Sequence, residues 1–240
     1  VGLRRLAGQL FFMAGSIGVG LFMAVFGQAY PTGANAYSLF MGWSFLIFPW
    51  ALVSRFAPEW LLWATVTQVF LILGWQQAVL PALEWEALIF SILGALNCTL
   101  LGMREFSVLR GSTKWLAPLW TRWVLLTAAA SCWLFPILQV IFNPKTAGIA
   151  SLIGSALGLS GYALGAHFYR FKLPDAIAVI ITGGFWVMVL EGLGVKLWAQ
   201  WDSIGTGFQG IGMAVWTLLL FSGAILYLHR AVGQIRRPYA

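Results

Sequence analysis

The sequence predicts an all-α integral membrane protein, a polytopic bundle of about eight transmembrane helices with both termini in the cytoplasm. Hydrophobic residues make up 60% of the 240 residues and charged residues only 9%, and the mean hydropathy is +0.86. These values lie far from those of a soluble domain. The apolar stretches are continuous, whereas the strands of a membrane barrel alternate between apolar and polar residues. Helices are the other structure that satisfies its own backbone hydrogen bonds in lipid.

Eight apolar stretches are long enough to cross about 30 Å of hydrocarbon. They cover Gln9 to Gly27, Tyr37 to Val53, Trp60 to Val79, Ala87 to Met103, Trp120 to Phe142, Ile149 to Phe168, Asp175 to Val195 and Phe208 to Leu228. We expect them to form a single transmembrane domain over residues 1–240. The chain starts with Val1 and its first residues lack a signal-peptide cleavage site, so we also expect the full-length protein to have an upstream segment.

The lysines and arginines predict the orientation of these spans. If the chain starts inside, all of the 14 lysines and arginines except Lys145 and Lys196 fall in inner segments. Cytoplasmic loops retain these residues, so both termini are predicted to be cytoplasmic. The net charge of +7 follows from the same retention and gives no reason to expect a nucleic-acid partner. Tryptophans fall near both ends of the spans, as in an interfacial belt.

The loop between the first two spans, Gln28 to Ala36, carries no lysine or arginine, which favours its placement outside. A pattern surrounds it: Gly-Gln-x-Tyr, a turn of small residues, Leu-Phe, a tryptophan and a proline that ends an apolar stretch. Its residues are Gly27, Gln28, Tyr30, Gly33, Leu39, Phe40, Trp43 and Pro49, followed by Arg55 and the run from Trp60 to Trp63.

This pattern resembles a family of bacterial multi-pass inner-membrane proteins of unknown function. The resemblance covers about the first 75 residues, and beyond them only the multi-span character is similar. It implies a location in the bacterial cytoplasmic membrane. Genes of the family often lie beside a gene for a membrane-anchored protein with a Gly-Asp-Tyr-rich motif, so the resemblance implies a membrane-protein partner. It implies no activity.

Ionisable residues within spans are candidate functional residues, because burying a charge in lipid is costly. Glu191 is the strongest candidate, five residues before Lys196, or ~7 Å along a helix. Two interpretations stay open: a proton or cation site, or a carboxyl that is neutral or paired with Lys196 near the outer interface. Gln68, Asn97 and Gln139 either join neighbouring helices by hydrogen bonds or form a polar interior with Glu191.

The sixth span carries a face of small residues. Gly154, Gly158, Gly161 and Gly165 recur at spacings of four, three and four, which places them on one side of a helix. Such GxxxG patterns let two backbones approach closely. The face is predicted to pack either on another helix of the same chain or on a partner subunit.

No catalytic or cofactor motif is present in the sequence: there is no Walker loop, nucleophile elbow, HExxH or dinucleotide fingerprint. His167, His229, Cys98 and Cys132 lack metal-ligand spacing, so we expect no cofactor. We therefore predict a non-enzymatic multi-spanning subunit or scaffold that binds another membrane protein or membrane lipids. The alternative is a small-molecule or ion transporter or channel with a polar site near Glu191. A lipid-modifying enzyme would need a polar interfacial cluster that we do not find.

Overall fold

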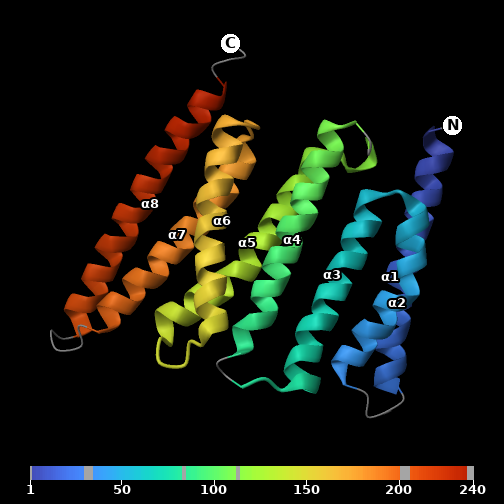
Figure 1. Ribbon diagram of the computed structural model, residues 1–240, viewed down its shortest axis with the longest axis horizontal. Coiled ribbons are helices and arrows are strands. Elements are labelled where there is room, and N and C mark those ends of the chain that lie inside the picture. The colour runs from blue at the N-terminus through green and yellow to red at the C-terminus, as the bar shows by residue number, and fades with distance from the viewer. Residues whose placement is uncertain (1, 30–34, 83–84, 112–113, 201–205, 237–240) are drawn as a thin grey trace. The chain divides into compact units, whose positions relative to one another are not determined.

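A computed structural model (Figure 1) describes residues 2–29, 35–82, 85–111, 114–200 and 206–236. Eight helices in this part of the chain are long and apolar enough to cross a membrane. They are α1 (Gly2–Ala29), α2 (Ala36–Ser54), α3 (Ala57–Gly74), α4 (Glu86–Leu109), α5 (Leu119–Phe142), α6 (Ile149–Phe171), α7 (Ala176–Ala199) and α8 (Thr206–Arg236). The predicted all-α class and the predicted number of spans are confirmed.

The helices end at residues that differ from the predicted boundaries. At the chain ends, α1 starts at Gly2 and α8 continues to Arg236, because a helix persists beyond the apolar stretch when no breaker follows it. The third span is an α-helix only to Gly74 and continues as a π-helical turn, Trp75–Val79. Leu80 then adopts a left-handed backbone with φ 50°, and Pro81 prevents further helix.

Within the predicted transmembrane domain, the chain packs as two compact units. Unit 1 contains Val1–Pro81 and Arg104–Thr121, and unit 2 contains Ala82–Met103 and Arg122–Ala240. Helices α4 and α5 therefore each contribute one end to unit 1 and the remainder to unit 2. Each unit is described by itself.

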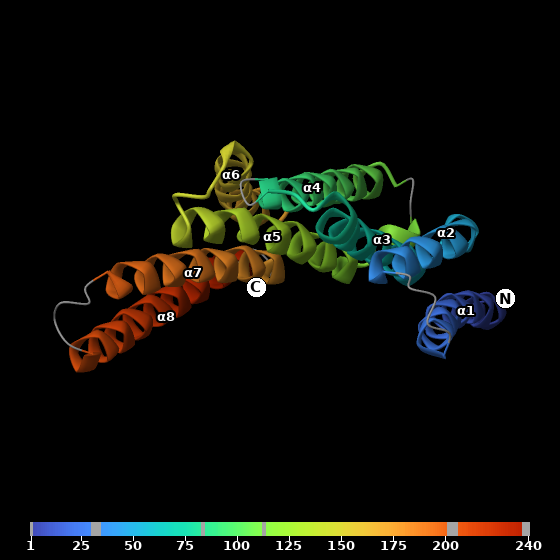
Figure 2. The ribbon, with the colours of Figure 1, turned by 90° about the horizontal axis from the view of Figure 1, so that it is seen from below.

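Unit 1 is built on the hairpin of α2 and α3, and Figure 2 shows α1 on one side of it. Ser44 and Thr67 share a hydrogen bond of 2.6 Å between the two hairpin helices. Trp43 of α2 joins the hairpin to α1, since its indole Nε1 donates to the Ser16 carbonyl at 2.7 Å. Its ring lies so close to Gly20 that a Cβ there would be 2.5 Å away, so α1 needs a glycine at this position.

Unit 2 has a core made by side chains of α5, α6 and α7. Its buried members are Ala130, Trp133, Ile137, Tyr162, Phe185 and Val189. The Tyr162 hydroxyl donates to the Ala130 carbonyl at 2.6 Å, which satisfies the polar end of a buried ring. Helix α8 packs on α7, where Trp216 covers Gly194.

Candidate functional sites

The glycine face of α6 packs inside unit 2, on Trp133 of α5. A Cβ on Gly158 would lie 2.8 Å from the Trp133 Cβ, and a Cβ on Gly161 would lie 2.4 Å from its ring. Gly94 of α4 contacts the same ring, at 2.4 Å from a would-be Cβ. The indole therefore occupies a slot between glycines of two helices. The sequence left open whether this face packs on another helix of the same chain or on a partner subunit. The structure shows the contact with helices of the same chain.

The other two glycines of this face also contact α4 and α7. A Cβ on Gly154 would lie 2.1 Å from the Ser91 Oγ of α4, and a Cβ on Gly165 would lie 3.2 Å from the Thr182 Cγ2 of α7. The four glycines thus serve contacts with α4, α5 and α7. Close approach explains their spacing.

Glu191 lies on α7, facing α8. Its Oε1 accepts a hydrogen bond of 2.6 Å from the Thr217 hydroxyl, and its Oε2 is buried with no partner among the described residues. Lys196 instead donates to the Phe142 carbonyl at 3.0 Å. The structure therefore shows Glu191 bonded to Thr217, and it does not show the pairing with Lys196 that we considered.

The remaining polar candidates lie on three different helices. Asn97, on α4, is buried and donates to the Leu93 carbonyl at 2.9 Å. Gln139, on α5, accepts from the Ser151 hydroxyl at 2.7 Å. Gln68 lies on α3, in unit 1, whereas the other three belong to unit 2. The Leu93 bond lies within α4, whereas the Ser151 bond joins α6 to α5, and the Asn97 amide also donates to the Cys132 Sγ of α5 at 3.8 Å. Bonds between helices are the structural role of such residues in membranes.

A groove of about 980 Å³ runs between α1 and α2 in unit 1. Of the residues that carry the family resemblance, Gly27, Gln28 and Leu39 line this groove, and Trp43 fastens α2 to α1. Tyr30 lies outside the described residues. The groove wall is mostly apolar, and its polar side chains are Gln28, Asn35 and Ser38.

Three buried charged groups went unrecognised in the sequence analysis, and the first is Arg104 near the end of α4. Its side chain is 1% exposed and forms an ion pair of 2.9 Å with Glu105. It also donates to the carbonyls of Leu116, Ala117 and Pro118 at 2.9 to 3.2 Å. Arg104 therefore fixes the α4–α5 connection by satisfying carbonyls that a loop leaves unpaired. No sequence signal indicates that these carbonyls converge.

The second is Asp175, the N-cap of α7. Its carboxylate accepts from the backbone N–H groups of Ile177 and Ala178, from Arg122 Nη1 at 2.8 Å and from Trp123 Nε1 at 3.1 Å. Burial raises the pKa of this carboxyl, but the bonds from Arg122, Ala178 and Trp123 outweigh burial and hold the pKa below its usual value. An aspartate just before an apolar stretch is an N-cap signal, whereas nothing in the sequence identifies Arg122 as its partner.

The third is Glu59, in the first turn of α3. It is fully buried, its Oε1 accepts from the Ser16 hydroxyl of α1, and its Oε2 has no partner among the described residues. An acidic residue in the first turn favours the helix N-terminus. In the described part of the chain, no three His, Cys, Asp or Glu side chains are grouped to hold a metal ion.

Comparison of this chain with protein-family models, with curated proteins and with solved structures finds no match to any of them. Its function is therefore argued from its own geometry.

Proposed function

We propose that this chain is a non-enzymatic multi-spanning subunit or scaffold that binds another membrane protein in the groove between α1 and α2. The groove supports this proposal because it is large and is lined by glycines with free space beside them and by polar side chains. A Cβ on Gly18 or on Gly27 would meet no atom of the described residues within 4 Å, so a second backbone can approach α1 closely there. Gln28, Asn35 and Ser38 add hydrogen-bonding groups. Helices associate in lipid through such close packing and hydrogen bonds, which an acyl chain cannot form.

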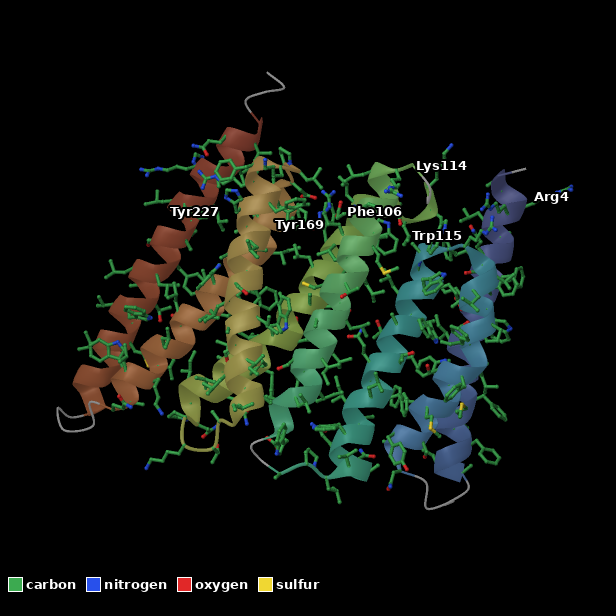
Figure 3. All side chains as sticks on the ribbon, viewed as in Figure 1. Arg4, Phe106, Lys114, Trp115, Tyr169 and Tyr227 are labelled. Atoms are coloured by element: carbon green, nitrogen blue, oxygen red, sulfur yellow. The ribbon has the colours of Figure 1, made fainter. Side chains whose placement is uncertain are left out.

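The location that we propose is the bacterial cytoplasmic membrane, with both chain ends inside. The family resemblance supports the membrane, and the retained lysines and arginines support the orientation. Within unit 1, Figure 3 shows Arg4 and Lys114 at the same end of the helices. Within unit 2, it shows Tyr169 and Tyr227 at one end, close in sequence to the predicted inner residues Arg170 and Arg230.

Cysteine labelling tests this orientation. In a variant without Cys98 and Cys132, we expect cysteines at Ala82 and Thr146 to react with an impermeant reagent from outside, and a cysteine at Lys172 only from inside. All three positions are exposed, so failure to react reports the wrong side and not burial. Reaction of any one position from the unexpected side would contradict the proposed orientation.

Filling the groove tests the proposed function. With a photo-crosslinker at Phe22, which lines the groove, the parent is expected to capture one membrane protein in cells. Gly27→Leu is expected to reduce that capture at least tenfold, because the leucine occupies the space for a close helix. The matched control is Gly223→Leu on α8, whose Cβ would also meet nothing within 4 Å, and it is expected to capture the same protein normally. Crosslinks to lipid alone, or equal capture by both variants, would overturn the proposal.

The alternative, a transporter or channel, is favoured by one observation: the buried Oε2 of Glu191 has no partner among the described residues. We expect Glu191→Gln to retain the fold and the partner, since the glutamine oxygen still accepts from Thr217. Reconstituted parent protein is expected to show no proton- or cation-dependent flux that this substitution removes. Thr217→Val is the control that removes the hydrogen-bond donor and keeps the Glu191 carboxyl group. A flux that is lost in Glu191→Gln, with the fold intact, would replace the scaffold proposal with transport.

A further inference from the structure

A second pocket, of about 520 Å³, lies in unit 1 where α1 begins, α2 ends and the α4–α5 connection turns. Three separate segments bring a cation to its wall: Arg5 from α1, Arg55 after α2 and Lys114 from a short 3-10 turn. All three side chains belong to exposed residues. The described residues that line this pocket include no aspartate or glutamate. The pocket therefore has a concentrated positive charge that no carboxylate among its described lining residues neutralises.

The backbone adds to this positive field. Arg55 has φ 46° and ψ 43°, a left-handed conformation that turns the chain so that α3 starts two residues later. Phe56, the N-cap of α3, offers no side-chain hydrogen bond to the first turn, and Phe56, Ala57 and Pro58 line the pocket. An 18-residue helix thus points its positive end at the pocket. Glu59 of the same turn is fully buried and holds Ser16.

The pocket also lies at the boundary of the spans. Four spans of the structure have an end here: those that begin at Leu3, Ala57 and Leu119, and the one that ends at Ser54. Two tryptophans line the pocket, Trp120, which is 36% exposed, and Trp115, whose ring centroid lies 6.1 Å from that of Trp60. Such rings favour the depth of lipid headgroups. Figure 3 shows Trp115 beside Lys114 at this end of unit 1.

We propose that this pocket binds the phosphate headgroup of an anionic phospholipid. Arginine and lysine side chains supply charge-assisted bonds to phosphate oxygens, and basic pockets among helices at the cytoplasmic side are suited to anionic headgroups. Tryptophans at the span ends favour a lipid over a soluble anion, because the ligand's acyl chains can continue along the helices. This site is separate from the α1–α2 groove, so the inference holds whether or not the groove binds a protein.

Native mass spectrometry of the detergent-purified protein tests the site. Dioleoyl phosphatidylglycerol is expected to bind at least tenfold more tightly than dioleoyl phosphatidylcholine. The triple variant Arg5→Gln, Arg55→Gln, Lys114→Gln is expected to lose about a hundredfold in affinity for phosphatidylglycerol, at about fivefold per cation. The matched control removes the same charge at three other exposed residues: Arg110→Gln, Lys172→Gln and Arg230→Gln. It is expected to bind the lipid as the parent does.

Three results would overturn the proposal. Equal loss in the triple variant and in its control would indicate attraction by net charge alone. Equal binding of the two lipids would exclude recognition of the anionic headgroup. Displacement of phosphatidylglycerol by millimolar glycerol 3-phosphate would assign the pocket to a soluble phosphate compound. Should the triple variant fail to fold, Lys114→Gln alone is expected to weaken phosphatidylglycerol binding about fivefold and to leave the melting temperature unchanged.

Discussion

Gly161→Leu is expected to lower the melting temperature of the detergent-purified protein by about 6–12 °C. Even a Cβ at this position would lie 2.4 Å from the Trp133 ring. The ring cannot move away, because Gly94 of α4 holds its other edge at a similar distance. Overpacking of this kind costs about 3 kcal/mol, and each kcal/mol shifts the melting temperature of a chain this long by about 2–4 °C. Thermal unfolding followed by tryptophan fluorescence measures the shift.

Two further variants identify the cause. Gly184→Leu on α7 is the control, because a Cβ there would meet nothing within 4 Å, and it is expected to melt within about 2 °C of the parent. Trp133→Ala in the Gly161→Leu background is expected to recover part of the loss, since the smaller side chain vacates the slot. A Gly161→Leu variant that melts like the parent would show that α6 does not depend on this contact.

The number and type of helices could be predicted because they depend on local composition. Apolar stretches of sufficient length identify spans without knowledge of their neighbours. The glycine spacing on α6 likewise predicted close packing, since Gly154 to Gly165 lie on one face whatever covers it. Which helix covers that face depends on the path of the whole chain, and the structure shows that Trp133 of α5 does so together with α4 and α7.

The buried charged groups could not be predicted for the same reason. Glu59 bonds to Ser16, 43 residues away, and Asp175 bonds to Arg122, 53 residues away. The distribution of lysines and arginines assigns Arg104 and Arg122 to inner segments, where exposed cations are expected. Both side chains are instead buried. Burial of an arginine requires a specific set of acceptors, and those acceptors come from segments whose approach is a tertiary property. Sequence reasoning therefore found the polar residues inside spans and overlooked those at their ends.

The polar candidates of the spans and the buried ion pairs differ in what they do for the protein. Asn97 bonds within α4, whereas Gln139 and Glu191 bond to a neighbouring helix, and bonds between helices contribute on the order of 1 kcal/mol or less. Asp175 combines an ion pair, an indole N–H and a helix cap in one carboxylate. Removal of this carboxylate leaves several hydrogen-bond donors unsatisfied at once. The stability of unit 2 is therefore expected to depend more on Asp175 than on any of the polar candidates within the spans.

Asp175→Ala is accordingly expected to lower the free energy of unfolding by about 3–5 kcal/mol. The substitution removes the counter-charge of Arg122, whose side chain is only 9% exposed. Asp175→Asn is expected to cost less, since the amide oxygen can still cap α7. Lys172→Gln is the control: this cation lies in the same connection but is exposed, and its loss is expected to leave the melting temperature unchanged. Equal melting of parent and Asp175→Ala would show that the pair contributes nothing to stability.

Acid provides a second measurement on the same carboxylate. Arg122 and the N–H groups of Ala178 and Trp123 hold the pKa of Asp175 below its usual value in the folded protein. The ionised carboxylate therefore stabilises the fold most at a pH at which Asp175 is ionised in both the folded and the unfolded protein. This stabilisation is fully present above the unfolded pKa of about 3.9 and is lost as the pH falls through the lower folded pKa. The melting difference between the parent and Asp175→Asn is therefore expected to stay constant from about pH 7 to pH 5 and to shrink below about pH 4. A difference that is unchanged in acid would mean that Arg122 does not depend on the negative charge of Asp175, and that the carboxyl acts on α7 only as a cap.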